Sequence, residues 1–131
     1  HKSDRYLAFG FASAKLDDFV NLPASRLTAL FFSLAALALP GASAAAAARA
    51  VRRDARHHKS PNAGWPEAAM AGALDFKLAG PRVYHGERVE DHFMGDGRAD
   101  LTAADIRRAL TLYRVAMLGA LALVATLAIM A

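Results

Sequence analysis

The residues best suited to chemistry lie in one short stretch, Ser60 to Leu74, which holds a carboxylate, a single tryptophan and several turn-forming residues. Pro61, Asn62 and Gly64 indicate a loop. Pro66 then suits the first turn of a helix, where its missing amide hydrogen is not needed. The sequence therefore predicts a loop that leads directly into a helix.

That helix is expected to run from Trp65 to Leu78. Glu67 shares its face with apolar residues spaced by three and four, namely Met70, Ala71, Leu74 and Leu78. The opposite side is lined with small residues that allow another helix to come close, namely Ala68, Ala69, Gly72 and Ala73. From spacing alone, Glu67 either stabilises the positive end of its helix or accepts a proton in a reaction. Trp65 is a packing anchor or a binding surface.

Two further charged motifs could bind a ligand. Asp17 and Asp18 are adjacent near the end of an amphipathic helix, so they point in different directions and cannot share a proton. In Gly95-Asp96-Gly97-Arg98, the glycines let backbone amides approach a ligand. This second motif lacks the Gly-Lys-Ser/Thr ending of a Walker loop and the spacing of an EF-hand. A solvated face and an ordinary charged turn are the simpler interpretations.

The composition favours a membrane protein, because 55% of the 131 residues are hydrophobic. Leu27 to Ala48 holds 22 uncharged residues, enough at about 1.5 Å per residue to cross a bilayer core of about 30 Å. Pro40-Gly41 interrupts it, so a kinked span and a re-entrant hairpin both stay open. Val115 to Ala131 adds 17 uncharged residues.

The basic residues gather between these apolar runs. Twelve Lys and Arg lie between Arg49 and Arg114, against four before Leu27, which predicts a cytoplasmic location for this segment. A run of four arginines at helical spacing either faces lipid or binds phosphate or carboxylate groups (Arg49, Arg52, Arg53 and Arg56). No aromatic-basic pattern of a nucleic-acid module occurs, so no nucleic-acid partner is expected. With no cysteine and no ligand spacing of histidines, no metal site is predicted.

The fold class expected is an all-α integral membrane protein. Its two apolar helices, one of them kinked or re-entrant, flank a mostly helical cytoplasmic segment. That segment includes a short β-hairpin, Pro81 to Tyr84 with Glu87 to Glu90, around His85-Gly86. Thr102 and Asp105 form a capping-box start for the last helix. The expected divisions are an amphipathic segment (1–26), a membrane segment (27–48), a cytoplasmic substrate-site segment (49–114) and a membrane helix (115–131).

Several motifs together resemble the adenosylcobinamide-phosphate synthase family of cobalamin biosynthesis. They are Ser60 to Leu74, Gly80-Pro81-Arg82-Val83-Tyr84, Gly95-Asp96-Gly97-Arg98, Lys15-Leu16-Asp17-Asp18, Asn21, Pro23 and Arg26-Leu27-Thr28. They cover almost the whole chain in the right order. The chain departs from the family pattern at Lys15, where arginine is expected, and at Ala79 and His85, where glycine is expected.

The resemblance implies the carboxy-terminal part of a multi-pass enzyme of the bacterial cytoplasmic membrane. Such an enzyme is a carbon-nitrogen ligase that joins aminopropanol, or its phosphate, to the free propionate of adenosylcobyric acid. The chain starts at His1 without a methionine and ends in an apolar run. We therefore expect it to be part of a longer chain whose preceding membrane helices it needs for activity. The lipid bilayer and the corrinoid substrate are the other expected partners.

The resemblance also suggests roles for individual residues. Glu67, Asp17 and Asp18 are the candidate catalytic residues. The candidate substrate-binding residues are Ser60, Asn62, Gly64, Trp65, Arg82, Tyr84, Asp96 and Arg98. The cofactors are unknown, since a nucleotide and a divalent cation would suit the reaction but this segment carries no motif for either. A non-catalytic membrane scaffold or transporter subunit is the alternative function.

Overall fold

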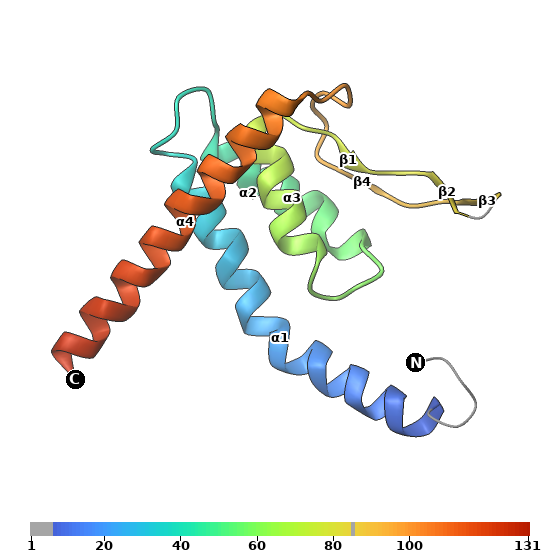
Figure 1. Cartoon of the computed structure of the whole chain (residues 1–131), viewed down its shortest axis with the longest axis horizontal. Coiled ribbons are helices and arrows are strands. Elements are labelled where there is room, and N and C mark those ends of the chain that lie inside the picture. Colours follow the sequence, from blue (N-terminus) through green and yellow to red (C-terminus); the bar gives the residue numbers. More distant parts are fainter. Residues whose placement is uncertain (1–6, 85) are drawn as a thin grey trace.

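The computed structural model describes the backbone of residues 7–84 and 86–131, and side chains from residue 10 onward except those of residues 84 and 85. The chain is mostly helical (Figure 1). Its elements are α1 (Leu7–Ala35), α2 (Ala44–Asp54), the 3-10 turn η2 (Ala55–His57), α3 (Gly64–Leu74), β1 (Leu78–Ala79), β2 (Arg82–Tyr84), β3 (Glu87–Val89), β4 (Phe93–Met94) and α4 (Ala103–Met130). The long helices α1 and α4 cross and diverge toward the two ends of the chain, and the short helices α2 and α3 lie beside the crossing.

The helix α1 continues through residues 26 and 27 although Pro23 lies inside it. Proline removes one helical hydrogen bond and tends to kink a helix, and Figure 1 shows α1 bending part-way along its length. The chain then reverses through a turn around Pro40-Gly41, where Gly41 has φ +70°. Ser43 starts α2 by accepting a hydrogen bond from the Ala46 amide at 3.2 Å.

A continuous span over 27–48 is therefore wrong as a description of the backbone, and the turn-back alternative is the one the structure has. The physical reason is the turn formed by Pro40-Gly41 together with the Ser43 cap, which starts a new helix in the opposite direction. As a result α1 and α2 form a hairpin, and α3 packs against both of them.

Small side chains let α2 and α3 pack backbone against backbone, as the sequence predicted. A Cβ atom added at Gly72 would lie 2.5 Å from the Ala46 carbonyl oxygen and 2.7 Å from the Ala50 Cβ atom. Ala47 and Ala50 of α2 and Ala68 and Ala69 of α3 are buried here. The core is thus rich in alanine, with few large side chains.

Gly72→Ala is expected to lower the free energy of unfolding by about 1–3 kcal/mol, because the new methyl group has no room between the two helices. Thermal unfolding of the detergent-solubilised protein measures the change. The matched control is Gly119→Ala in α4, where the added Cβ would meet only the Phe31 ring, at an ordinary 3.8 Å. This control should unfold at the same or a higher temperature, and an equal loss in both variants would contradict the packing argument.

The expected extent of the third helix, Trp65 to Leu78, is wrong at its carboxyl end. Asp75 adopts the left-handed conformation with φ 61°, and the Phe76 amide donates back to the Ala71 carbonyl oxygen. This ends α3 at Leu74, as a left-handed residue commonly ends a helix. Leu78 lies in β1 instead, where it pairs with Met94.

The expected hairpin is confirmed, since β2 and β3 pair antiparallel with Tyr84 opposite Glu87. His85 of its predicted turn lies outside the described residues. β1 also pairs antiparallel with β4, so that the four strands form one two-stranded β ribbon that leads back to the helices. Ala79 has φ 57°, a left-handed conformation that favours glycine and gives a physical reason for the glycine expected there.

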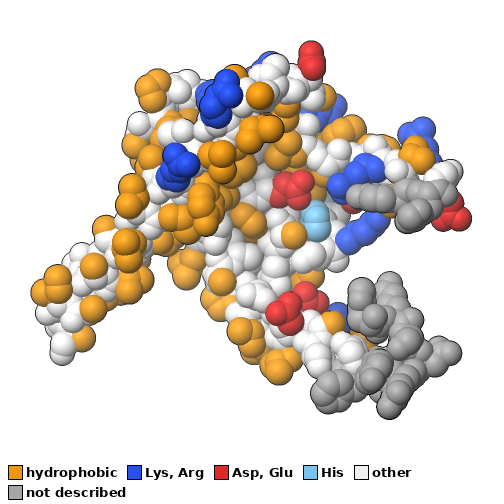
Figure 2. Space-filling view, in the orientation of Figure 1, with side chains coloured by type: hydrophobic (Ala, Val, Ile, Leu, Met, Phe, Trp, Pro, Cys, Tyr) orange, Lys and Arg blue, Asp and Glu red, His pale blue; other side chains and the backbone are white. Residues whose placement is uncertain are grey.

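The last helix, α4, starts with the capping box predicted at Thr102 and Asp105. Its first half packs on α1, where Phe32 and Tyr113 meet edge to face with ring centroids 6.4 Å apart. Beyond Met117 nearly all its side chains are exposed and apolar, and Figure 2 shows them covering the free end of the helix. In the part of the chain that the structure describes, only α4 is long and apolar enough to cross a membrane.

Candidate functional site

The loop between η2 and α3 is held by its own side chains. The Ser60 hydroxyl oxygen accepts hydrogen bonds from the amides of Asn62 at 3.2 Å and Ala63 at 3.3 Å. The Ser60 amide in turn donates to Nδ1 of His58 at 2.9 Å. Gly64 follows directly, and a Cβ atom there would lie 2.3 Å from the Ala55 carbonyl oxygen. Gly64 is therefore required for close packing of the loop.

Asn62 ties this loop to α1. Its Nδ2 donates to the Asp18 carbonyl oxygen at 2.9 Å, while its Oδ1 accepts from the Ser25 hydroxyl and from Arg26, each at 3.1 Å. All three partners lie about 40 positions before Asn62 in the sequence. The side chain of Asn62 thus fixes where the amino-terminal half of α1 lies relative to α3.

As a result, both aspartates predicted to be functional lie beside the loop. One cavity of about 320 Å³ is lined by residues from α1 and from the loop, namely Asp17, Asp18, Asn21, Ala24, Ser25, Thr28, Ser60, Asn62, Ala63 and Pro66. Asp17 accepts a hydrogen bond from Asn21 at 3.0 Å. We call this cavity the acidic pocket, because it has two carboxylates and no basic side chain in its lining. It brings together four of the residues proposed from the sequence.

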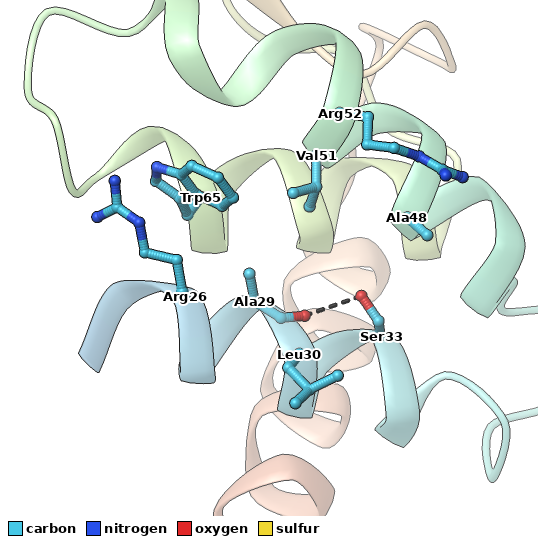
Figure 3. A pocket seen from close by; sticks show the side chains of 8 residues that line it. All are labelled: Arg26, Ala29, Leu30, Ser33, Ala48, Val51, Arg52 and Trp65. Carbon is cyan, nitrogen blue, oxygen red and sulfur yellow. Dashed lines mark hydrogen bonds between the residues drawn. The ribbon is translucent and has the colours of Figure 1, made fainter. Parts of the chain in front are cut away.

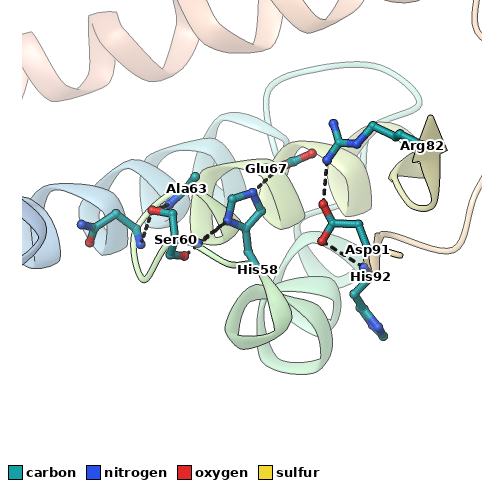
Figure 4. A network of polar contacts seen from close by, with 8 residues as sticks. His58, Ser60, Ala63, Glu67, Arg82, Asp91 and His92 are labelled. Carbon is teal, nitrogen blue, oxygen red and sulfur yellow. Dashed lines mark hydrogen bonds and ion pairs between the residues drawn. The ribbon is translucent and has the colours of Figure 1, made fainter. Parts of the chain in front are cut away.

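Glu67 lies one turn into α3 and faces His58. Its Oε2 atom is 3.6 Å from Nε2 of His58, and its side chain is 29% exposed. Figure 4 shows how the imidazole ring bridges the loop and the helix, since one nitrogen meets the Ser60 amide and the other meets Glu67. His58 was not among the residues proposed from the sequence.

Trp65 is held by Arg26 of α1, whose guanidinium carbon lies 4.4 Å from the centre of the indole ring. Beside them lies an apolar cleft of about 380 Å³ between α1, α2 and α3 (Figure 3). It is lined by Arg26, Ala29, Leu30, Ser33, Ala48, Val51, Arg52 and Trp65. This cleft could accept a flat apolar group against the indole.

The other proposed substrate-binding residues lie elsewhere and have partners within the fold. Arg98 donates to Asp105 at 2.6 Å, Asp96 accepts from Arg53 at 2.6 Å, and Arg82 donates to Asp91 at 2.8 Å. None of the three lines the acidic pocket. The side chain of Tyr84 lies outside the described residues. The structure therefore does not bring the whole predicted set to one place.

Asp54 is a functional candidate that sequence reasoning missed. It is only 1% exposed, yet it accepts two hydrogen bonds from Arg53, at 2.7 and 2.8 Å, and one from the Gly95 amide at 2.9 Å. Burial acts to raise the pKa of Asp54, but these hydrogen bonds and the charge of Arg53 outweigh it and hold the pKa below its usual value. The sequence signal that could have indicated Asp54 is its position as a single carboxylate within the basic run from Arg49 to Lys59. Asp54 joins α2 to the root of the β ribbon.

Asp54→Asn is expected to lower the free energy of unfolding at pH 7 by about 1–3 kcal/mol, since a charged hydrogen-bond acceptor is lost. Because the folded-state pKa of Asp54 is depressed, its contribution is complete above the unfolded pKa of about 3.9 and is lost as the pH falls toward the folded value. The difference between wild type and variant, measured by denaturant unfolding, should therefore shrink between pH 7 and pH 3.

The matched control is Asp96→Asn, which removes the other carboxylate paired with Arg53. The Asp96 side chain is 78% exposed, so its pair with Arg53 should contribute about 1 kcal/mol or less. Equal losses in the two variants, or a loss in Asp54→Asn that does not change with pH, would contradict the role given to Asp54.

No set of three or more histidine, aspartate or glutamate side chains in the described part of the chain is arranged to hold a metal ion. What the loop, α1 and α3 offer is a pair of carboxylates beside hydroxyl and amide groups, with a third carboxylate on α3 facing an imidazole. Carboxylates of this kind can orient an amine or accept a proton.

Comparison with known proteins identifies relatives. The model of a family described as "CobD/Cbib protein" matches residues 1–113. A protein named "Cobalamin biosynthesis protein CobD" from Sinorhizobium sp is 55% identical over 115 residues, which cover 86% of this chain and 36% of that protein. Proteins of the same name are 52% identical over 91% of this chain in Rhodobacter capsulatus and 49% identical over 92% in Mycobacterium tuberculosis.

The chain thus spans little more than a third of the length of these relatives, 36% of the first two and 38% of the third. No solved structure matches it.

Proposed function

Because this chain belongs to the CobD/Cbib protein family, we propose that it is part of an enzyme of cobalamin biosynthesis. The reaction is the joining of aminopropanol, or its phosphate, to the free propionate of adenosylcobyric acid. The product is adenosylcobinamide or its phosphate. The names of the relatives support the pathway, and the resemblance of the motifs around Ser60–Leu74 supports the reaction.

The observation that carries this proposal is the acidic pocket, which joins Asp17 and Asp18 to Ser60 and Asn62 across a large sequence separation. An ammonium group is a suitable occupant, because two carboxylates and several neutral acceptors surround the space. In the reaction the amine nitrogen attacks an activated carbonyl carbon. The nitrogen loses a proton, and the activating group leaves the carbon with its electron pair.

Glu67 is the proposed proton acceptor, and Asp17 and Asp18 orient the amine. His58 contacts Glu67 and so fixes the direction of its carboxylate. Activation of the propionate requires a co-substrate such as a nucleotide, for which these residues carry no recognised motif. The developing oxyanion needs hydrogen-bond donors, and the backbone amides of the loop from Ser60 to Gly64 are the nearest candidates.

The remaining candidates would bind the large corrinoid. Trp65 forms one wall of the apolar cleft, which suits the edge of a corrin ring. Tyr84 on the ribbon is proposed to contact the same substrate. For Arg82, Asp96 and Arg98 to bind substrate, each would exchange its present ion-pair partner for a substrate group.

We further propose that the protein lies in the bacterial cytoplasmic membrane with more than one spanning helix. The exposed apolar end of α4 and the basic residues before it support this, since they fit a span with a cytoplasmic amino end. The rest of a longer chain would cover the apolar faces of α1 and α4. We therefore expect the residues printed here to be inactive alone.

Complementation of a corrinoid auxotroph tests the function. A strain without the full-length protein should grow when supplied with cobinamide but not with cobyric acid, and re-expression of the protein should restore growth on cobyric acid. Full growth on cobyric acid without the protein would overturn the proposed reaction. It would leave the non-catalytic scaffold or transporter subunit as the better account.

A further inference from the structure

The basic run from Arg49 to Lys59 does not form one continuous face. Arg53 is engaged with the carboxylates of Asp54 and Asp96. Arg56 leaves the direction of α2, because the chain tightens into η2 from Ala55 onward. Arg56 is thereby placed beside Arg26 of α1, from which it is far apart in the sequence.

These two arginines line a second polar cavity, of about 380 Å³. Its lining consists of Arg26, Ala55, Arg56, His58, Ser60, Pro61 and Trp65. We call it the basic pocket, because it has two guanidinium groups and an imidazole but no carboxylate in its lining. Ser60 lines both pockets.

The charges of the basic pocket are not neutralised within the described residues. The acceptors of Arg26 are all neutral oxygens, those of Leu22, Ser25 and Asn62. The side chain of Arg56 makes no hydrogen bond or ion pair with any residue that the structure describes. Glu67 faces the imidazole of His58, but it does not line the cavity. Two cations that share one cavity repel each other, so an anion there would be bound favourably.

The geometry also limits the kind of anion. Arg26 lies against the face of Trp65, and its hydrogen bonds to the loop and to α1 hold it in place. Its guanidinium is therefore oriented before a ligand arrives, which reduces the entropy lost on binding. Two guanidinium groups approach from different elements, an arrangement that suits the several oxygens of a phosphate better than a single carboxylate.

We propose that the basic pocket binds a phosphate monoester group, with Arg26 and Arg56 as its donors. This proposal rests on the proposed function only where it places the ligand near Glu67. The binding measurement does not require turnover, so it tests the phosphate site by itself. A phosphate held here lies across Ser60 from the acidic pocket. A small molecule with both an amine and a phosphate would then reach both pockets. A lipid headgroup offers the same phosphate chemistry from a different source.

The test is calorimetric binding of O-phosphoethanolamine to the full-length protein in neutral-lipid nanodiscs, with ethanolamine as the probe that lacks phosphate. Wild type should bind O-phosphoethanolamine, and Arg56→Gln should raise its Kd about tenfold or more, because one charge-assisted contact is lost. The matched control is Arg52→Gln. Arg52 lies in α2, four positions before Arg56, and is also exposed, but it lines the apolar cleft instead, and its removal should leave the Kd unchanged.

Nanodiscs that contain phosphatidic acid separate the two sources of phosphate. If Arg56→Gln weakens binding of the soluble probe, the ligand is a free phosphate ester. If it weakens only the interaction with phosphatidic acid, the phosphate site stands and its source is a lipid headgroup. If neither interaction changes, or if Arg52→Gln weakens both equally, the basic pocket is not a phosphate site. Failure of the proposed function would give a different result, in which O-phosphoethanolamine still binds but the full-length protein forms no amide product.

Discussion

Glu67→Gln is expected to reduce amide formation by the full-length enzyme by about 10²–10⁴-fold, the usual contribution of a general acid or base. Glutamine has the same size and keeps one acceptor oxygen that can face His58, so α3 should fold normally. What it cannot do is accept a proton from the attacking amine. The measurement is kcat and KM for conversion of adenosylcobyric acid, where the loss should lie in kcat.

The alternative role of Glu67, as a charge at the amino end of α3, predicts a very different result. Its removal would then cost about 1 kcal/mol or less of stability while turnover stayed near normal. Glu87→Gln on β3 is the control, because it removes an exposed carboxylate from the ribbon. Near-wild-type turnover in Glu67→Gln would remove Glu67 from the catalytic residues.

Asn62→Ala is expected to lower both stability and turnover, because Asn62 holds the loop against α1. Its loss removes three hydrogen bonds, those with Ser25, Arg26 and the Asp18 carbonyl, at a cost of about 1–3 kcal/mol in the free energy of unfolding. Displacement of Asp17 and Asp18 by about 1 Å is enough for a loss of roughly 10²-fold in turnover. Thermal unfolding and product formation are measured on the same preparations.

Two further variants separate positioning from general instability. Asn62→Asp keeps the oxygen that accepts from Ser25 and Arg26 but loses the donor to Asp18, so it should retain more stability than Asn62→Ala. Asn21→Ala removes only an exposed amide that bonds Asp17, and it should be near wild type in stability. If Asn21→Ala and Asn62→Ala behaved alike, the link between the loop and α1 would not position the site.

Local signals predicted several elements of the fold well. The capping box at Thr102 and Asp105, the hairpin around Gly86 and the close packing at Gly72 each depend on a few neighbouring residues. Pro40-Gly41 was recognised as an interruption, but the uncharged run was long enough for a span, so a kinked span and a hairpin both stayed open. The backbone turn and the Ser43 cap favour a hairpin instead. Length alone could not distinguish the two.

Contacts between distant segments were beyond the reach of sequence patterns. The left-handed conformation that ends α3 falls on Asp75, a residue type that adopts it only occasionally. The pairing of Arg26 with Trp65, the burial of Asp54 and the convergence of Arg26 with Arg56 all join residues from different elements. No periodicity within one helix encodes such pairs. They follow from how α1, α2 and α3 pack.

The central claim is that the reversal at Pro40-Gly41 places Asp17 and Asp18 on the same side of the membrane as Glu67. Single cysteines at Ser13, Ser60 and Ala99 test it, in a full-length protein otherwise free of cysteine, with a membrane-impermeant maleimide applied to intact cells. The account predicts that all three cysteines are protected in intact cells and are labelled once the cells are permeabilised. Labelling of the Ser13 position in intact cells, with the other two protected, would contradict it, because Asp17 and Asp18 would then lie across the bilayer from Glu67.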